Sequence, residues 1–480
     1  MSHETHTAQL PPGAEVGPGG QPVNDRREIF GWMMYDWACS VYNTTVITTL
    51  LGLYLTDVAQ RAVGPRGAIL TVGGYRVLTA ESLFPYCIGV SVFLQVFLLP
   101  VLGAIADFSN VKKRMMAAFC YVAVVATCLL FFVTESTYLL GGLLLIISNL
   151  CFGAAMVFYN AFLPEITTED LRDRVSSRGF ALGYLGGGLL LAVNLGMVAG
   201  ADRLGISGAM AVRLSLLSAG VWWGVFAAYA FRRLRSRAAA RPLPAGTSYL
   251  TVGFSELRKT FAELRRLPHT LRYLLGYLLY NDGIQTVVTV AGVFIEQELF
   301  KSRGLEPDRS FLISLILVIQ FTAIGGALLF ERVARLVGTK RAIISALVLW
   351  TCVVLYAYGF LQTKAHAWVL GAAIAVVMGG SQALSRSLFS QMIPRGREAS
   401  FFGIYEISER GTSWMGPVIF ALVLDSTGSY RTALLSLVFF FAAGMVVLLF
   451  TNTARAIHDA GNLLPEEVKH ETAPAETSPA

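Results

Sequence analysis

Long apolar stretches alternate with short polar segments along most of the chain, and each apolar stretch is close to the length that crosses a bilayer. A transmembrane helix requires about 20 mostly apolar residues, and in lipid its backbone polar groups must be satisfied within the segment. The pattern predicts twelve helices, six on each side of segment 232–269. They are expected at 29–56, 82–106, 115–134, 137–163, 177–200, 209–231, 270–296, 310–330, 342–362, 366–393, 401–424 and 430–452. We therefore expect an all-α integral membrane protein with two six-helix halves.

The composition agrees with this architecture: 55% of the residues are hydrophobic and only 14% are charged, whereas soluble domains carry roughly a quarter charged residues. The expected organisation places six-helix halves at 28–231 and 270–453, with a linker at 232–269. Residues 1–27 are expected to be a disordered tail without a signal peptide. The tail 454–480 is polar and is expected to be disordered from about Asn462.

Basic residues are distributed unequally between the two sides of the predicted membrane. The side with both tails and the linker collects 24 Lys and Arg residues, and the opposite loops collect 9. Because basic loops stay in the cytoplasm, both termini are predicted to be cytoplasmic, in the inner (plasma) membrane of a bacterium. The net charge of +7 arises from these loops, so nucleic-acid binding is not expected.

Several kinds of chemistry are disfavoured. The six cysteines fall inside predicted spans without paired spacing, which argues against disulfides and metal ligation. The histidines lie in tails or at helix ends, which disfavours a histidine proton relay. Nucleophiles do not cluster as an enzyme requires, and no cofactor motif is found.

The two halves share several features. Helix 2 ends at Gly103 and Asp107 before a basic cluster, and helix 8 ends at Gly326 and Glu331 before another. Helices 1 and 7 each carry an aspartate, Asp36 and Asp282, and helices 4 and 10 end at prolines. Repeated six-helix halves are typical of rocker-type transporters. The chain has no Gly-x-x-x-x-Gly-Lys-Ser/Thr loop, so transport would be driven by a gradient or be passive.

These residues also carry a family resemblance. The glycine–acid–basic loop after helix 2 resembles the signature loop of the major facilitator superfamily. Three further motifs resemble the vacuole-effluxer-like family, whose yeast members export amino acids from the vacuole after autophagy and whose bacterial members have no assigned substrate. The motifs are Gly31-Trp-Met-Met-Tyr-Asp36-Trp37-Ala-Cys-Ser40, Phe158-Tyr159-Asn160-Ala-Phe-Leu-Pro164-Glu165, and Val175-Ser-Ser-Arg178-Gly179-Phe-Ala-Leu-Gly183-Tyr-Leu-Gly186-Gly. The resemblance implies the major facilitator fold and solute transport.

Polar residues recur along one face of helices 1 and 7. An ionisable group at the centre of a span costs about 2.5–3.5 kcal/mol, so each aspartate is expected to have a functional or structural role that offsets this cost. The stripes form either a water-accessible translocation face or a packing surface between helices. They consist of Asp36, Ser40, Asn43, Thr44 and Thr48 in helix 1, and of Asp282, Gln285, Thr286, Thr289 and Glu296 in helix 7.

Arg386 lies well inside helix 10. It is interpreted as a counter-charge for Asp282 or for a substrate carboxylate, or as part of a buried ion pair that only orders the bundle. If Arg386 pairs with Asp282, Asp36 is the better proton carrier. Asn160 lies one turn before Pro164 and either satisfies the backbone there or contacts solute.

A second group of charged residues is predicted to gate the cytoplasmic side. Asp107 with Lys112, Lys113 and Arg114 is expected to hold this side closed by pairing with acids or helix ends of the other half. Arg178 either reaches lipid phosphate or bonds across to helix 11. Glu406 and Arg410 form either a structural pair along helix 11 or part of an internal gate.

Two remaining patterns concern packing. The glycines Gly183, Gly186, Gly187 and Gly188 lie inside an apolar span and predict close helix packing. Within the linker, Phe254, Leu257, Phe261 and Leu264 recur at helical spacing opposite Glu256, Arg258, Lys259 and Arg265. This predicts an amphipathic helix on the cytoplasmic leaflet that tethers the halves or binds a partner.

The sequence thus predicts a monomeric secondary active transporter that moves a small charged solute by alternating access, with amino acids as the candidate class. The ammonium group of an amino acid would suit an aspartate and its carboxylate would suit Arg386, with a proton as the coupling ion. The alternatives are an exporter of drugs, sugars or other solutes and a lipid flippase, which should show a lateral opening between helices.

Overall fold

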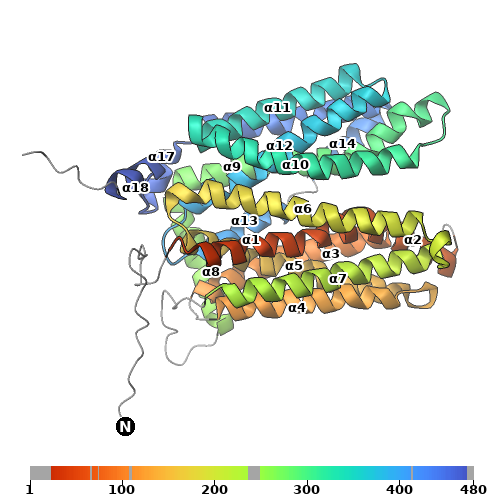
Figure 1. Cartoon of the computed structure of the whole chain (residues 1–480), viewed down its shortest axis with the longest axis horizontal. Coiled ribbons are helices and arrows are strands. Elements are labelled where there is room, and N and C mark those ends of the chain that lie inside the picture. Colours follow the sequence, from red (N-terminus) through yellow and green to blue (C-terminus); the bar gives the residue numbers. More distant parts are fainter. Residues whose placement is uncertain are drawn as a thin grey trace, which may run out of the picture.

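The computed structural model describes residues 23–64, 67–73, 75–107, 111–235, 249–411 and 415–472. This part of the chain is almost entirely helical and forms two bundles side by side (Figure 1). Within it, eleven helices are long and apolar enough to cross a membrane, and the shorter apolar helix Met415–Thr427 lies in the predicted eleventh span. The expected fold class, twelve helices in two six-helix halves, is confirmed.

The N-terminal half begins where the Asp25 side chain accepts a hydrogen bond from the backbone of Arg27 and caps the first helix. A π-helical stretch, η1 (Tyr42–Leu50), continues that helix without a break into α2. A two-stranded antiparallel hairpin, which the span pattern did not predict, follows α2. The elements are α1 (Arg26–Val41), α2 (Leu51–Val63), β1 (Ala68–Val72), β2 (Tyr75–Thr79), α3 (Leu83–Asp107), α4 (Lys112–Leu129), α5 (Tyr138–Ile166), α6 (Arg172–Ala199) and α7 (Gly208–Arg233).

The C-terminal half begins at Pro268, which suits the first turn of a helix because its missing N–H has no partner there. The predicted span 401–424 contains α13, the π-helical stretch η7 (Ile407–Gly411) and α14, with 412–414 outside the described residues. The helices are α9 (Pro268–Leu299), α10 (Arg309–Val337), α11 (Thr339–Phe360), α12 (Lys364–Gln391), α13 (Glu398–Glu406), α14 (Met415–Thr427), α15 (Tyr430–Ser436) and α16 (Val438–Leu449).

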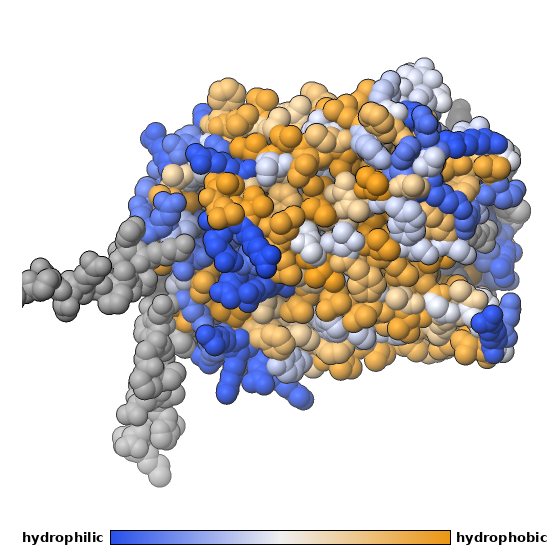
Figure 2. Space-filling view, turned by 45° about the horizontal axis from the view of Figure 1, so that its top comes forward, coloured by the Kyte–Doolittle hydropathy of each residue, from blue (hydrophilic) through white to orange (hydrophobic). Residues whose placement is uncertain are grey.

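The surface of the bundle carries a broad apolar belt between two polar ends (Figure 2). Large apolar side chains such as Phe93, Phe97, Val193, Val225 and Leu422 are more than half exposed. Such a contiguous patch would be costly in water, but its position suits the hydrocarbon layer of a membrane. The protein is a multi-pass membrane protein.

The two ends of the bundle carry different elements and are called the tail side and the hairpin side. The tail side holds residues 23–25, the start of α4, residues 234–235 and the C-terminal helices α17 (Thr453–Asp459) and α18 (Pro465–Thr472). The hairpin side holds β1, β2 and the connections 133–137 and 361–363. Figure 1 shows α17 and α18 at the same end as the start of α1.

The end of the chain differs from the expected disordered tail. Asn462 is buried, and its side-chain amide donates to the carbonyls of Gln391 and Ile393 at the end of α12, both at 2.8 Å. Helix α18 follows, and Val468 on it is buried. The composition suggested disorder because it did not reveal that one asparagine would satisfy the backbone carbonyls after α12. Residues 1–22 and 473–480, also expected to be disordered, lie outside the described part.

Candidate substrate and gating site

Arg386 on α12 reaches from the C-terminal half into the N-terminal half. Its Nη2 lies 3.2 Å from Oδ2 of Asp36 on α1, and the two side chains are 3% and 8% exposed. Its Nε donates to Oγ of Ser176 and its Nη2 to the Ser176 carbonyl, both at 3.0 Å, and Nη1 lies 3.4 Å from Oδ1 of Asn160. A buried guanidinium with this many acceptors holds three helices of the other half in register with α12.

Aromatic rings surround the guanidinium. Its carbon lies 4.8 Å from the ring centroid of Trp32, 5.5 Å from that of Tyr159 and 4.3 Å from that of Phe180. Trp32 and Tyr159 stack with centroids 4.4 Å apart, and the Tyr159 hydroxyl donates to Asp36 at 2.6 Å. These contacts provide cation–π stabilisation. The sequence pattern did not single out Trp32, Tyr159 or Phe180 as site residues, although all three lie in the motifs that carry the family resemblance.

Glycines bring α6 close enough to α1 for this arrangement. A Cβ atom on Gly179 would lie 2.6 Å from Oδ2 of Asp36, and one on Gly183 would lie 2.5 Å from Oγ of Ser40. Neither position has room for a side chain. The glycine series therefore serves close helix packing, as predicted from the sequence, and it also makes room for the ion pair.

The pairing of Arg386 with Asp282, one of the options left open by the sequence, does not form. Oδ2 of Asp282 on α9 accepts the backbone N–H of Gly416 at 2.6 Å, because this carboxylate faces α14 rather than α12. Its Oδ1 is buried and has no hydrogen-bond partner among the described residues. The two aspartates thus differ in their surroundings: Asp36 has a cation beside it, and Asp282 has none in the described part of the chain.

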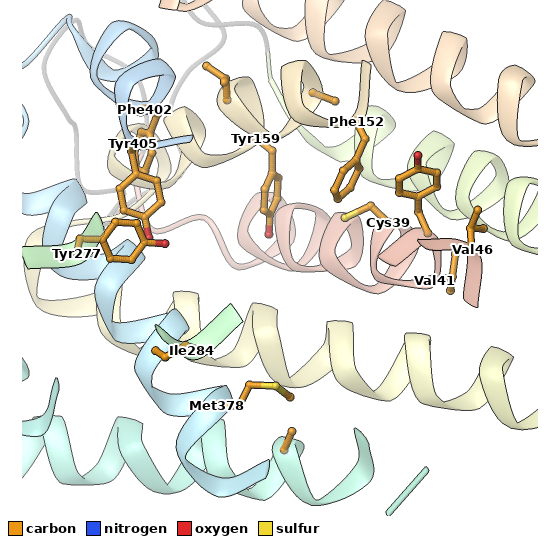
Figure 3. Close-up of a cluster of buried hydrophobic side chains, with 14 of the residues drawn as sticks. Cys39, Val41, Val46, Phe152, Tyr159, Tyr277, Ile284, Met378, Phe402 and Tyr405 are labelled. Carbon is orange, nitrogen blue, oxygen red and sulfur yellow. The ribbon is translucent and has the colours of Figure 1, made fainter. Parts of the chain in front are cut away.

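A further contact between the halves runs through Asn160 on α5. Its side-chain amide donates to Oε1 of the fully buried Glu406 on α13 at 2.8 Å. Nearby, Tyr277 of α9 stacks on Tyr405 of α13 with centroids 4.4 Å apart (Figure 3). Asn160 therefore links Arg386 to α13. The side chain of Arg410, the predicted partner of Glu406, lies outside the described residues.

Three other predicted site residues lie away from this cluster's hydrogen bonds. Asn43 is exposed and Gln285 is half-buried, and neither side chain makes a hydrogen bond with another described residue. Ser40 is half-buried on α1, one turn from Asp36. Asn43 lies in the π-helical stretch that begins at Tyr42, and the next residue, Thr44, faces α6 as Ser40 does, since a Cβ atom on Gly187 would lie 3.0 Å from it.

On the tail side, Asp107 at the end of α3 caps α13. Its carboxylate accepts the backbone N–H groups of Ala399 and Ser400 at 3.0 and 2.8 Å, and the Ser400 hydroxyl at 2.5 Å. A carboxylate at a helix N-terminus satisfies unpaired N–H groups and interacts favourably with the helix dipole. A Cβ atom on Gly103 would lie 2.2 Å from the Ala399 carbonyl oxygen, so the glycine permits this close approach.

The basic residues after Asp107 differ in the contacts that they make. Nζ of Lys112 bonds to Oε1 of Glu165 on α5 and lies 4.0 Å from Asp107. Lys113 and Arg114 make no hydrogen bond or ion pair with another described residue. The expected basic cluster thus contributes one lysine to the described contacts, and that lysine bonds within its own half.

Another basic residue makes the cross-contact that Arg178 was expected to make. Arg178 is exposed and bonds to none of the described residues. Arg172, about one and a half turns earlier on α6, is buried and donates to the Ser390 carbonyl on α12 at 3.1 Å. The predicted bond of Arg178 to helix 11 is therefore not formed with the described residues of α13 and α14.

The linker helix α8 (Tyr249–Arg266) docks on the tail side through buried acids. Glu256 is 3% exposed and bonds to Arg397, which precedes α13, at 2.7 Å. Burial alone would raise the pKa of Glu256, but hydrogen bonds from Lys259 and Arg397 hold the pKa below its usual value. The predicted division into an apolar face and an opposite charged face is wrong: Glu256 and Leu264 are buried, whereas Phe254 and Phe261 are exposed on the same stripe as Arg258 and Arg265.

Across the described residues, the hydrogen bonds and ion pairs between the halves gather in the tail-side part of the bundle. Besides those above, Thr339 donates to Asp173, Tyr184 to Gln382 and Ser176 to the Ala383 carbonyl. No such bond joins the halves near the hairpin side within the described part. The polar contacts between the halves thus gather at one end, whereas α6 and α10 also pack together nearer the middle, where a Cβ atom on Gly188 would lie 3.1 Å from Gln320.

Known structures with this fold include the proton:xylose symporter XylE bound to a sugar analogue, with a TM-score of 0.64 and 14% identity over 92% of this chain and 99% of that one. The human organic anion transporter MFSD10 has a TM-score of 0.60 and 15% identity over 89% of this chain and 100% of that one. At these identities the similarity shows the fold.

Relatives with higher identity extend the comparison to sequence. The uncharacterized MFS-type transporter YxiO of Bacillus subtilis is 30% identical, over 90% of this chain and 97% of that protein. Autophagy-related protein 22-1 of Aspergillus niger is 26% identical, over 95% of this chain and 93% of that protein. Fold and relatives together define a secondary transporter of the major facilitator superfamily, which is not an enzyme. Residues 24–461 match the vacuole effluxer Atg22 like family, and the chain belongs to that family.

Proposed function

We propose that the protein is a secondary active transporter that moves a small charged solute, with amino acids as the first class to test, by alternating access. The observation that carries the proposal is the ion pair between Arg386 and Asp36, which joins the halves at 3.2 Å inside a buried aromatic cluster. Separating two opposite charges inside a bundle without water is costly. Movement of the halves therefore requires a new partner for Arg386 and a new partner for Asp36.

An amino acid supplies those partners in one molecule. Its carboxylate would take the place of Asp36 on the guanidinium of Arg386, and its ammonium group would take the place of Arg386 on Asp36. Trp32 and Tyr159 would line the site. Drugs, sugars and lipids offer no such matched pair of charges, so the contacts described here favour none of these alternatives.

Asp282 is the proposed coupling residue, which reverses the sequence-based assignment of Asp36 as the proton carrier. The reason is its environment: one carboxylate oxygen has a backbone partner and the other is buried without one. A buried carboxylate without a cation is costly. Binding of a proton removes that cost, and a proton gradient could then drive the movement of solute.

The capping of α13 by Asp107 is proposed to hold the tail side closed between transport steps. Since the hairpin-side ends of the two halves are not bonded to each other within the described residues, the arrangement corresponds to an outward-facing state if the tails are cytoplasmic. That orientation rests on the unequal distribution of Lys and Arg, as does the proposed bacterial inner membrane. The protein is proposed to act as a monomer, because each chain contains both halves.

Uptake into proteoliposomes tests the proposal. A panel of labelled amino acids is offered with and without an imposed pH gradient to the wild type, to Arg386→Gln and to Arg178→Gln. Arg178 is the matched control because it is exposed and lies on a helix of the same site. We expect Arg386→Gln to abolish uptake and Arg178→Gln to retain it. If no amino acid is taken up by the wild type, or if both variants transport equally, the proposed site is wrong.

A further inference from the structure

Helix α8 has a buried face towards the bundle and an exposed face that combines aromatic and basic residues. The face towards the bundle is buried and contains Gly253, Glu256, Thr260 and Leu264. A Cβ atom on Gly253 would lie 3.0 Å from side-chain atoms of Val101 and Ile105, which fixes this face against the last two turns of α3. The helix therefore lies beside the tail-side end of a membrane span.

A second face of α8 is aromatic and exposed. Phe254 is 65% exposed and Phe261 is 45% exposed, and their spacing of seven residues places them on the same side. On α3, Phe97 is 62% exposed, about one turn before Val101, which contacts α8. The exposed rings of α8 thus continue the apolar surface of the spans. In water this exposure would be unfavourable, whereas burial in lipid would stabilise it.

A third set of residues borders the phenyl rings with positive charge. Arg258 and Arg265 are exposed and lie on the same stripe as the rings, and neither makes a hydrogen bond or ion pair with another described residue. Lys259 and Arg266 lie further round the helix and are also exposed. Long basic side chains beside a buried apolar stripe reach naturally to phosphate groups at the membrane surface.

We propose that this face of α8 is a binding site for anionic phospholipid in the leaflet on the tail side. Phe254 and Phe261 enter the upper acyl region, and Arg258 and Arg265 bind headgroup phosphate, for which the planar guanidinium group is suited. The acidic residues of α8 face inwards and bond to Arg397, so they do not repel the lipid. A phospholipid offers an apolar chain to the phenyl rings and a phosphate to the arginines, so this face favours lipid over a soluble partner.

Quenching by labelled lipid tests the site in the full-length protein. A fluorophore is attached to a single cysteine at Phe254 or, as the matched control, at Ser255, which is exposed but points away from the phenyl stripe. Nanodiscs contain equal mole fractions of quencher-labelled phosphatidylglycerol or phosphatidylcholine. We expect lipid to quench the probe at 254 and aqueous iodide to quench the probe at 255. Quenching at 254 should be at least about twofold stronger with phosphatidylglycerol.

The arginines provide the second arm. In the double variant Arg258→Gln/Arg265→Gln, the two lipids should quench the probe at residue 254 to the same level. A thermal stability equal to that of the wild type confirms that the variant is folded. If the probe at 254 is quenched by iodide and not by lipid, the face contacts water or a soluble partner, and the proposal is wrong. Equal quenching by both lipids in the wild type would also overturn it, because anionic selectivity would be absent.

Discussion

Nη2 of Arg386 lies 3.2 Å from Oδ2 of Asp36, and this contact joins α12 of the C-terminal half to α1 of the N-terminal half. Both residues are almost fully buried. The ion pair holds the halves together in the tail-side part of the bundle, and Asp107 holds them together at its tail-side end. Any motion that opens the tail side must therefore break bonds at both places.

The buried pair should behave as one unit in stability measurements. Removal of one partner leaves an unpaired buried charge, which costs about 3–5 kcal/mol. We expect Asp36→Asn and Arg386→Gln each to lower the thermal unfolding temperature strongly, and the double variant to lower it by much less than the sum. Thermal unfolding in detergent measures this, with Arg178→Gln as the control. Additive effects would show that the two side chains do not interact.

Asp282 should be required for coupling but not for exchange. Asp282→Asn keeps the shape of the side chain and removes the proton-binding group, so accumulation driven by a pH gradient should be lost while exchange between equal pools continues. Asp425→Asn, an exposed acid on α14, is the matched control and should behave as the wild type. Undiminished proton-driven accumulation in Asp282→Asn would remove this residue from the coupling mechanism.

Asp107→Asn should weaken the closed state of the tail side. Asparagine keeps one acceptor oxygen but loses the negative charge at the N-terminus of α13, which costs about 0.3–1 kcal/mol and changes the ratio of closed to open molecules by about twofold to fivefold. Spin labels at Arg114 and Arg341, which are exposed on different halves, should show a larger population at long distance. Solute binding should persist, and transport should slow. The control is Asp57→Asn in the middle of α2, whose side chain is 49% exposed; loss of binding in Asp107→Asn alone would contradict the role.

The docking of α8 should depend on pH in one direction only. The pKa of Glu256 is held below its usual value because Lys259 and Arg397 bond to its carboxylate. A lowered pKa stabilises the docked state above the pKa of the free side chain, about 4.3, and this contribution is lost as pH falls through the lower value. Hydrogen exchange, corrected for its intrinsic rate, should therefore show constant protection of α8 at neutral pH and a loss below about pH 4.

Glu256→Gln is expected to reduce that protection at neutral pH, with Ser255→Ala as the control on the exposed face. Equal protection of wild type and Glu256→Gln at all pH values would show that the contact with Arg397 does not hold the helix.

The membrane orientation can be tested with single cysteines in a background without the native ones. Arg395 on the tail side and Ala62 near the hairpin are both exposed, whereas Gly396 has a φ of +78° and tolerates a side chain poorly. An impermeant thiol reagent should label position 395 only from the cytoplasm and position 62 only from outside. The reverse pattern would invert the proposed orientation.

The fold could be predicted from the sequence because lipid restricts spans to long apolar helices. The partners of the charged residues could not be predicted from the sequence. Asp36 and Arg386 are separated by 350 positions, and Asp36 and Asp282 occupy equivalent places in the two halves, so no local pattern distinguishes which one meets the arginine. Only the packing of α14 against α9 directs Asp282 away from α12.

Helical spacing alone also misassigned residues whose partners come from elsewhere. Arg178 was chosen as the cross-contact, but Arg172 faces α12. Glu256 was assigned to the solvent face, because the sequence did not reveal that Arg397 would lie beside it. In each case the contact depends on a distant segment, and a periodic pattern within one helix carries no information about that segment.

The central claim is that the halves alternate around the Arg386–Asp36 pair, and paired distance measurements test it most directly. Spin labels at Arg114 and Arg341 report the tail side, and labels at Ser136 and Gln362, also exposed, report the hairpin side. In nanodiscs, Asp36→Asn should lengthen the tail-side distance and shorten the hairpin-side distance relative to the wild type. Unchanged distances, or a change of the same sign on both sides, would contradict alternation of the halves around this pair.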